Sequence, residues 1–462
     1  MDSGNSERVI VLEFNELCPS LMQSFICRGL LPHFAKLRES SVVMTTDANE
    51  LPPQLEPWVQ WVTVHSGLSA LEHGVLNLGE GHKLDEEAVA ALLSSRGLRV
   101  GIFGSMNTNY KNLNGFFIPD PWDINAVAEP QSLQPFHRIV SKQVQDSSTS
   151  NGISVRDMAA FGVFMSRHGM RMSTIAGGAR QILRERFDAG VKWRRSMILE
   201  RLQYDLFRNL WFKYKPHFST FFCNSTAHFQ HYYWRNMEPE LFTLPPGEND
   251  HASLQGAILE GYRAMDALVG RFMEEFPQCR LILLTALSQQ PWRETTKCTF
   301  RPRDFDAFLQ FVGIDPTTVK VKPVMAEEFH VLCDSKVRES LLAAIMEATL
   351  DGKPVMKASL EDDGVFCGCA ITDAVACDGS ILHPVGGAIP FTKLFHIVHS
   401  MRSGRHHPHG LFWVQSKRPR VISESVSLLD VAPTLLRLFG VNAQERMKGH
   451  SIPIDDAELV TA

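Results

Sequence analysis

The sequence has no apolar run near the roughly 20 residues that a membrane-spanning helix needs. Its first residues, MDSGNSERVIVLEF, lack the basic stretch followed by an apolar stretch that marks a secretory signal peptide. The formal net charge is −5, with both signs interspersed, so the chain lacks the basic face of a general nucleic-acid binder. These absences lead us to expect a cytoplasmic protein that has no transmembrane segment and binds no nucleic acid.

Paired cysteine motifs are also lacking. The nine cysteines are scattered, and the closest pair, Cys367 and Cys369, has one intervening residue instead of the two of a CxxC zinc or redox motif. Repeats and low-complexity tracts are missing, while 44% apolar and 21% charged residues are ordinary for a globular protein. The composition therefore predicts a packed globular protein with reduced thiols, as is usual in a cytoplasm.

Strand-like and helix-like segments alternate along much of the chain. Short apolar runs that favour buried strands occupy residues 9–14, 100–103, 218–223 and 281–285. Helical periodicity covers residues 21–37, 86–95 and 257–276. This alternation predicts an α/β protein with βαβ units in a mostly parallel sheet and helices on both faces. Ligands of such sheets bind at the carboxyl ends of the strands.

Two segments interrupt this alternation. Residues 152–214 lack strand signals, and Ile198, Leu202, Leu206 and Leu210 recur every four residues on one face of an amphipathic helix. A basic amphipathic helix can bind membranes, but a helical insertion that packs on the core explains the pattern more simply.

The second interruption mixes short strand-like runs with a helix at residues 336–349, which predicts a small α+β cap. The expected organisation is a core interrupted twice: core 1–151, helical insertion 152–214, core 215–318, α+β cap 319–370 and core 371–462.

Three groups of motifs stand in a fixed order along the chain. Near the C-terminus, GRHHPHGLFWV is followed by SLLDVAPTLLRLFGV and MKGHSI. Near the N-terminus, VIVLEFNELCPSL is followed by LLPHFAKLRESS and WVQWVTVHSGLSALEHGV, and TAHFQHYYWR lies between the two groups. Together these segments resemble the alkaline phosphatase superfamily, in particular type I phosphodiesterases and nucleotide pyrophosphatases. The resemblance implies an alkaline-phosphatase-like α/β fold over nearly the whole chain.

The resemblance also implies two close divalent metals and a Ser or Thr nucleophile that attacks a phosphate or sulfate ester. Three of the superfamily's ligand positions fall on Glu13, His231 and His406. Glu56 or Pro57 stands at the position of the nucleophile, and neither carries a hydroxyl group.

Three other ligand positions hold apolar residues, namely Ala227, Ala286 and Leu287. A two-metal mechanism is therefore not expected. Three protein ligands plus water is a standard catalytic zinc arrangement, so Glu13, His231 and His406 are predicted to hold one zinc or manganese ion.

Polar residues surround the expected site. We predict Glu56 as a general base, with Asn15 and Gln60 as further catalytic residues. The predicted substrate-binding residues are Asn107, Asn224, His228, Gln289 and His407. Two alternatives stay open: Asn107 is either a pocket residue or an ordinary turn asparagine, and His231 is either a ligand or a hydrogen-bonded core histidine.

Two hypotheses follow. In the first, the chain is a metal-assisted hydrolase or transferase that acts on a phosphate, phosphodiester or sulfate ester of a small molecule or glycan. In the second, it is a catalytically degenerate binding protein on the same scaffold. Both require five residues to converge at one edge of the sheet: Glu13, Glu56, His231, Ala286 and His406.

Overall fold

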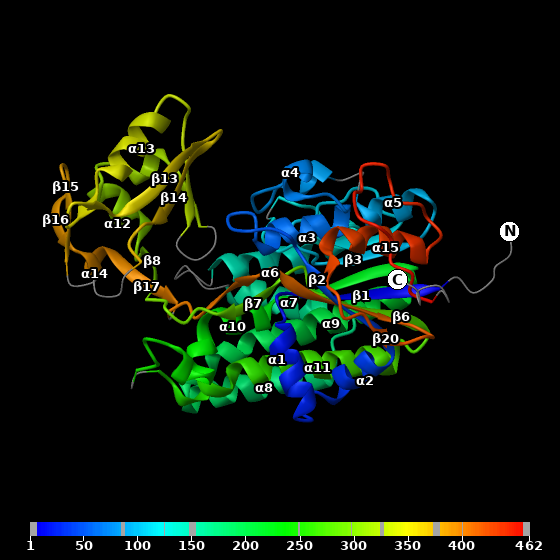
Figure 1. The fold of residues 1–462 in the computed structure, drawn as a ribbon. Helices are drawn as coiled ribbons and strands as arrows, with labels where there is room; N and C mark the ends of the chain where they lie inside the picture. The colour runs from blue at the N-terminus through cyan, green and yellow to red at the C-terminus, as the bar shows by residue number, and fades with distance from the viewer. Residues whose placement is uncertain are drawn as a thin grey trace.

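The computed structural model describes residues 7–84, 88–123, 125–146, 154–247, 250–296, 298–323, 328–372, 379–399 and 401–455 of the 462-residue chain. A main body is built around one large sheet with helices on both faces, and a smaller lobe stands apart from that sheet (Figure 1). The predicted α/β fold class is therefore confirmed.

The large sheet is mostly parallel, as predicted. Its strands, in spatial order, are β20 (Arg420–Val421), β2 (Ser41–Asp47), β19 (His409–Gln415), β6 (Cys279–Leu284), β1 (Arg8–Phe14), β5 (Phe218–Cys223), β3 (Val100–Phe103) and β4 (Gly115–Ile118), with β21 (Val426–Ser427) also paired to β2. Among these described strands, β19 alone runs antiparallel to its neighbours. The carboxyl ends of β1, β5, β6 and β3 therefore meet at one edge.

The central strands are continuous apolar runs because helices cover both faces of the sheet. In β1, Val9 and Val11 point into one hydrophobic cluster, while Ile10, Leu12 and Phe14 point into the other. This division follows from the two-residue repeat of a strand.

Each face of the sheet has its own set of helices. One cluster is covered by α1 (Pro19–Cys27), α2 (Pro32–Glu39), α6 (Gln134–Asp146), α9 (Arg195–Tyr214), α10 (Ser225–Met237) and α11 (Ala257–Glu275). The other is covered by α3 (Pro57–Ser66), α5 (Val89–Ser95) and α15 (Val431–Leu438). In Figure 1, α3, α5 and α15 lie above the sheet and α1, α2 and α11 lie below it.

Helix α3 has clear sequence limits. Pro57 occupies its first turn, where a fixed φ and a missing N–H are tolerated, so Glu56 stands at the N-cap. Gly67 ends the helix at φ 68°, a left-handed conformation that favours glycine. A Cβ at Gly67 would also lie 3.1 Å from both Ala432 and Met447, so glycine permits the close packing of α3 against α15.

The helical insertion joins the first cluster. It contains α7 (Val155–Arg167), α8 (Met172–Phe187) and α9; residues 152 and 153 lie outside the described residues. Leu206 and Leu210 of the periodic face are buried in the core. The simpler interpretation of that face, packing on the core, therefore holds for α9.

The lobe is an α+β unit with a hydrophobic cluster of its own. Its strands are β8 (Thr299–Pro302), β9 (Lys320–Pro323), β10 (Phe329–Leu332), β11 (Thr349–Leu350), β12 (Lys353–Pro354), β13 (Met356–Glu361), β14 (Gly364–Cys369), β15 (Ser380–His383), β16 (Gly387–Pro390) and β17 (Phe395–His399), and its helices are α12 (Phe305–Phe311), α13 (Arg338–Met346) and α14 (Phe391–Leu394). The cluster runs from Cys298 to Phe395, which is wider than the predicted cap at 319–370. The difference arises because β8 pairs with β17 and β15 pairs with β11, contacts between segments far apart in sequence.

Within the described part of the chain, no helix combines the length and apolar character needed to cross a membrane.

A carboxylate from α11 caps the N-terminus of α2. Asp266 Oδ1 accepts hydrogen bonds from the backbone N–H groups of His33 at 2.9 Å and Phe34 at 2.8 Å. Its Oδ2 lies 2.8 Å from His33 Nδ1. A negative charge at a helix N-terminus satisfies free N–H groups and interacts favourably with the helix dipole. Asp266 thus links two helices of the same layer.

We expect Asp266→Ala to lower the free energy of unfolding by about 2 kcal/mol, because two backbone donors lose a charged acceptor. Urea unfolding at neutral pH measures this difference. Glu274→Ala, an exposed change on the same helix, serves as the control and should leave stability nearly unchanged. Equal stability of the two variants would contradict the capping role.

Candidate metal centre at the carboxyl edge of the sheet

The site lies where three parallel strands end side by side. β1 ends at Phe14 and is followed by Asn15 and Glu16, while β5 ends at Cys223 and is followed by Asn224, the N-cap of α10. Beyond β6, the short strand β7 (Ser288–Pro291) forms a bridge to Glu16 through its first residue. This edge is where parallel sheets bind ligands.

Glu16 has an unusual backbone conformation. Its φ is 58°, in the left-handed region that costs a non-glycine residue on the order of 1 kcal/mol. The conformation is held from two sides: Gln230 Nε2 donates a 2.6 Å hydrogen bond to the Glu16 carbonyl, and the bridge to Ser288 fixes the other side. Strain held in this way is common at functional sites.

The two histidines of the site come from different elements. His231 lies on α10, two turns after the end of β5. His406 lies on β18 (Gly404–His407), which pairs with β7 so that His406 stands opposite Gln289. The β7–β18 pair therefore carries His406 to the same edge as Glu16.

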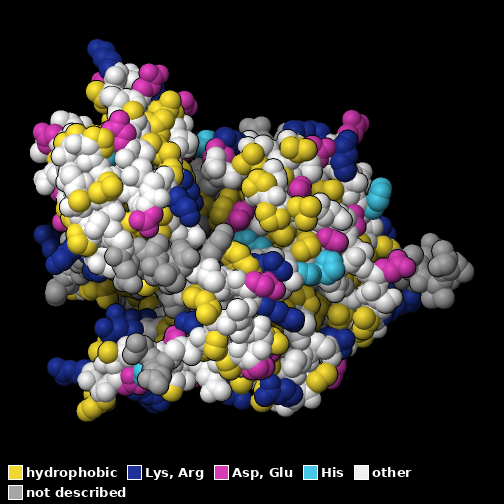
Figure 2. Space-filling model, turned by 60° about the vertical axis from the view of Figure 1, so that its left-hand side comes forward, with side chains coloured by type: hydrophobic (Ala, Val, Ile, Leu, Met, Phe, Trp, Pro, Cys, Tyr) yellow, Lys and Arg dark blue, Asp and Glu magenta, His cyan; other side chains and the backbone are white. Residues whose placement is uncertain are grey.

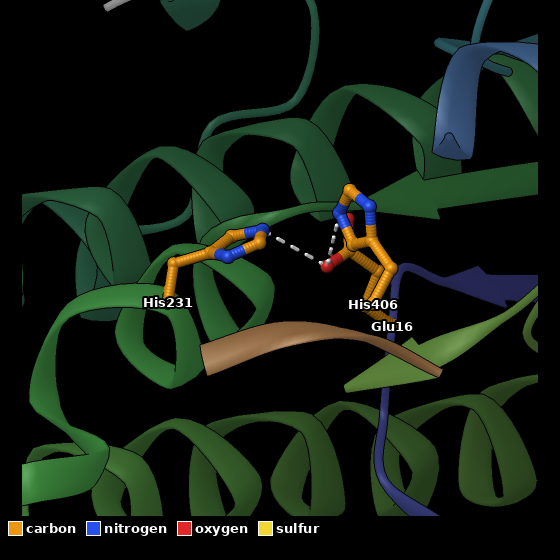
Figure 3. Close-up of side chains that lie close together, drawn as sticks. All are labelled: Glu16, His231 and His406. Carbon is orange, nitrogen blue, oxygen red and sulfur yellow. Dashed lines mark ion pairs between the residues drawn. The ribbon is translucent and has the colours of Figure 1, made fainter. Parts of the chain in front are cut away.

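The three side chains converge on one carboxylate oxygen, as Figure 3 shows. Glu16 Oε2 lies 3.1 Å from His231 Nε2 and 3.6 Å from His406 Nε2. One donor atom from each residue lies within 4.8 Å of the other two. The cluster is buried: Glu16 is 2% exposed, and the two imidazole side chains are 14% and 13% exposed.

The far nitrogen of each imidazole faces an acceptor. His231 Nδ1 lies 3.2 Å from the carbonyl oxygen of Gly404 and can donate to it. His406 Nδ1 lies 3.4 Å from Glu56 Oε2. Histidines that bind metals usually donate the other ring N–H to a carbonyl or carboxylate, which fixes the tautomer. Both rings are therefore oriented to present Nε2 as a ligand toward Glu16.

Amide groups orient the Glu16 carboxylate. Asn15 Nδ2 donates to Glu16 Oε1 at 2.9 Å and also to Asn224 Oδ1 at 2.8 Å. Gln289 Nε2 donates to Glu16 Oε2 at 2.5 Å. Trp61 Nε1 donates to Asn15 Oδ1 at 2.8 Å and completes the chain of contacts. These residues hold the carboxylate in place, and both N–H groups of Asn15 Nδ2 and of Gln289 Nε2 are used in hydrogen bonds within the protein.

The protonation states suit metal binding. Burial raises the pKa of Glu16, but the neighbouring His231 and His406 outweigh it and hold the pKa at about 2. Burial lowers the pKa of His406 to about 4 despite the Glu16 charge. Metal ligands must be deprotonated, so an ionised Glu16 and a neutral His406 are in the required states at neutral pH.

The geometry fits one divalent metal ion. Two ligands that each lie about 2.0–2.1 Å from a tetrahedral metal are roughly 3.4 Å apart, close to the 3.1 and 3.6 Å separations of this cluster. His406 Nε2 is buried and has no hydrogen-bond partner among the described residues. An unsatisfied buried nitrogen costs about 1–3 kcal/mol, which coordination would remove.

Glu56 borders the cluster on its open side. Burial raises the pKa of Glu56 to about 8, and the negative charge of Glu16 adds to the rise. The charges of Arg402 and of Glu328, which precedes β10 in the lobe, also act on Glu56. The site therefore faces the lobe, and Figure 2 shows a recess between the lobe and the main body. A groove of about 520 Å³ lies elsewhere, beside α8 and α11.

Glu13 is not part of the cluster, contrary to our expectation from the sequence. Its carboxyl group accepts a 2.6 Å hydrogen bond from Ser105 and lies 3.4 Å from His65 Nε2. Burial raises the pKa of Glu13 to about 8 and lowers that of His65 to about 4, so both are neutral at pH 7. Among the described residues, Glu16 is the carboxylate that joins His231 and His406.

The other predicted residues divide into two groups. Asn15, Asn224 and Gln289 lie around Glu16 and position it. Asn107 does not line the site: its side chain bonds to the backbone of Trp58, Asn77 and Gly79, and its φ is 55°, so it serves as a structural turn residue.

Three predicted residues have contacts away from the cluster. Gln60 Nε2 donates to the carbonyl of Gln54. His228 packs its ring 4.9 Å from that of Tyr232 on α10. His407 alternates with His406 along β18 and accepts a hydrogen bond from the backbone N–H of His409. A substrate-binding role for these three residues stays a prediction.

The expected second metal position is apolar. Ala286 and Leu287 are fully buried in the hydrophobic cluster of the α3 face, and Ala227 is buried as well. The carbonyl oxygen of Ala227 accepts a hydrogen bond from Gln289. The side chains at these three positions offer no metal ligands.

Sequence reasoning missed Glu16. The residue lies two positions beyond the end of β1, between Asn15 and the proline that begins α1, and its carboxylate in that loop was the available signal. Its left-handed φ, which aims the side chain at the histidines, leaves no trace in a single sequence.

No known protein-family model and no curated protein sequence matches this chain. Among solved structures, murine ectonucleotide pyrophosphatase/phosphodiesterase 5 matches with a TM-score of 0.42 and 10% identity, over 95% of this chain and 96% of that one. The human protein matches with a TM-score of 0.41 and 9% identity, over 96% and 97%. An inactive form of the murine protein in complex with AMP matches with a TM-score of 0.40 and 10% identity, over 95% and 96%. At this level of likeness, the chemistry has to be argued from the chain's own residues.

We expect Glu13→Gln to stabilise the protein relative to the wild type as pH rises. The pKa of Glu13 is about 8 when folded and about 4.5 when unfolded. The stability contributed by its neutral carboxyl is complete below pH 4.5 and is lost as pH rises through 8. The glutamine has no charge to lose, so the stability difference should grow by up to about 1.4 kcal/mol per pH unit within this window.

Urea unfolding at pH 5 and pH 8 measures the change, with the exposed Glu445→Gln as control. Parallel pH profiles for Glu13→Gln and the wild type would show that Glu13 is ionised in the folded protein.

Proposed function

We propose that Glu16, His231 and His406 bind one divalent metal ion and that the chain hydrolyses a phosphate, phosphodiester or sulfate ester at this site. The observation that carries the proposal is the convergence of two imidazole nitrogens on Glu16 Oε2, with the Nδ1 atom of each ring directed at an acceptor. A small-molecule or glycan ester and a cytoplasmic location stay predictions.

A nitrogen-rich site with one carboxylate suits zinc, with manganese as the second choice. Such an ion would supply Lewis-acid polarisation of an ester oxygen. Glu16 would contribute the negative charge, while His231 and His406 would contribute neutral donors.

Glu56 is placed to handle protons. Its side chain is 29% exposed, borders His406 and stands at the N-cap of α3, near the predicted position of a nucleophile. Neither Glu56 nor Pro57 offers a hydroxyl group, so water is the expected nucleophile. Glu56 in its ionised form would accept the proton from the attacking water, and the alkoxide or phenoxide would leave and take a proton from solvent. The charge of Arg402, which reaches Glu56 and His406, would attract the anionic ester.

A binding protein on the same scaffold is the second candidate. The observation that favours it is the apolar filling of the second metal position by Ala227, Ala286 and Leu287. In this case the cluster would hold a metal or an anionic ligand without turnover. A panel of p-nitrophenyl phosphate, phosphodiester and sulfate esters, with zinc or manganese supplied, separates the two candidates.

We expect the wild-type protein to bind about one zinc or manganese ion, and we expect Glu16→Gln and His406→Ala to lose it, because three ligands are needed. Elemental analysis after dialysis against a metal buffer measures the content. Glu13→Gln is the matched control and should keep the metal. A metal-free wild type, or loss of metal in the control alone, would contradict the assignment of Glu16.

We expect Glu56→Gln to lower kcat for ester hydrolysis by about 10²–10⁴ without changing metal content, because the amide cannot accept the proton. Its oxygen can still accept a hydrogen bond from His406 Nδ1, so the ligand stays oriented. Glu56→Ala tests orientation, since it removes the carboxylate acceptor and leaves His406 only its hydrogen bond to the Leu55 backbone. If Glu56→Gln keeps full activity while Glu56→Ala loses metal, Glu56 orients His406 and is not the base.

A further inference from the structure

Helix α8 carries its apolar side chains on the outside. Met172, Ile182, Leu183 and Phe187 are 76%, 62%, 56% and 86% exposed, and Ile175 is 42% exposed. At about 100° per residue, these five positions fall within an arc of about 140° on the helix. They therefore share one face of α8, which also includes Arg186, and the described part of the chain leaves this face uncovered.

The side of α8 that faces the protein is small and polar. Thr174 and Gln181 are buried, and Gln181 Nε2 donates to Glu185 Oε1 and to the carbonyl of Val191. Gly177 lies against α9, where a Cβ would be 3.0 Å from Arg201 Nη1. A helix on a water-soluble protein normally has the opposite arrangement, with its apolar stripe toward the core.

The segment around α8 is strongly basic. Residues 154–214 contain twelve Lys or Arg and five Asp or Glu, a net charge of +7 in a chain whose overall charge is −5. Arg180, Arg184 and Arg186 are exposed on α8 itself, and none forms an ion pair with an acidic side chain of the described residues. Unpaired arginines beside an apolar face complement a surface that is both negative and apolar.

We propose that the outer face of α8 docks on the surface of an anionic lipid bilayer. The apolar side chains enter the interface between headgroups and acyl chains, and Arg180, Arg184 and Arg186 contact the lipid phosphates. A second copy of the same face would bring like-charged arginines together, so a lipid surface is the better partner. In Figure 1, α8 lies at the bottom of the main body, on the other side of the sheet from α3 and α15.

This surface contains no residue of the Glu16, His231 and His406 cluster. Membrane docking is therefore independent of the proposed hydrolysis, and each can fail without the other.

Sedimentation of the full chain with vesicles tests the proposal. The protein should bind vesicles of phosphatidylcholine with added phosphatidylserine, bind phosphatidylcholine alone much more weakly, and be released by high salt. Leu183→Gln/Phe187→Gln and Arg184→Gln/Arg186→Gln should each weaken binding roughly tenfold or more. Leu71→Gln, an equally exposed apolar residue at 86% on the short helix α4 (Ala70–His73), is the control and should bind like the wild type.

All altered side chains are exposed, so thermal unfolding should be unchanged and loss of binding cannot come from misfolding. Failure of the wild type to bind phosphatidylserine vesicles at low salt would overturn the proposal. So would equal binding by the wild type and Leu183→Gln/Phe187→Gln. A concentration-dependent dimer that this double variant abolishes would show that a second copy covers α8 instead.

Discussion

One carboxylate oxygen, Glu16 Oε2, organises the candidate site. It is contacted by Gln289, His231 and His406, which come from three elements widely separated in sequence. A buried charge is costly unless it is paired, so the ionised carboxylate requires compensation from its surroundings. The two imidazoles and the Gln289 amide supply part of that compensation. A cation held between the carboxylate and the imidazoles would complete it, which is the physical basis for expecting a metal here.

Glu13 and Glu16, three residues apart, show how strongly neighbouring groups change the pKa of a buried carboxyl group. Glu13 is within a strand, under α3, with a hydroxyl group and a neutral imidazole as partners, and its pKa rises to about 8. Glu16 lies beyond the end of the same strand, between two other imidazoles, and its pKa falls to about 2. Burial is nearly equal at both positions, so burial alone does not mark the ligand. The difference lies in which groups the backbone turn after β1 brings within reach.

The segments outside the large sheet give the protein two further surfaces. The lobe borders the cluster of Glu16, His231 and His406, where the charge of Glu328 reaches Glu56. It is therefore placed to restrict which ligands reach the cluster. The helical insertion uses α9 to extend the core and leaves α8 with its apolar face outward. One insertion thus contains a helix that stabilises the fold and a helix whose burial pattern is reversed.

The sequence by itself determined the elements whose signals are local. Continuous apolar runs predicted β1, β3, β5 and β6, because strands that are buried on both faces consist mainly of apolar residues. Their alternation with helical segments predicted the mostly parallel sheet. The order of the motifs pointed to His231 and His406, and the structure brings these two residues together.

Only the tertiary structure decided the features that depend on long-range contacts. Glu16 replaces Glu13 beside the histidines because of a left-handed turn that Gln230 and Ser288 stabilise from distant segments. The lobe extends beyond the predicted cap because its outer strands pair across long intervals of sequence. The apolar face of α8 points outward because the opposite, polar face of the helix packs against α9. The periodicity of a sequence determines which side chains share one face of a helix. The contacts of the folded chain determine whether that face packs against the core or remains exposed.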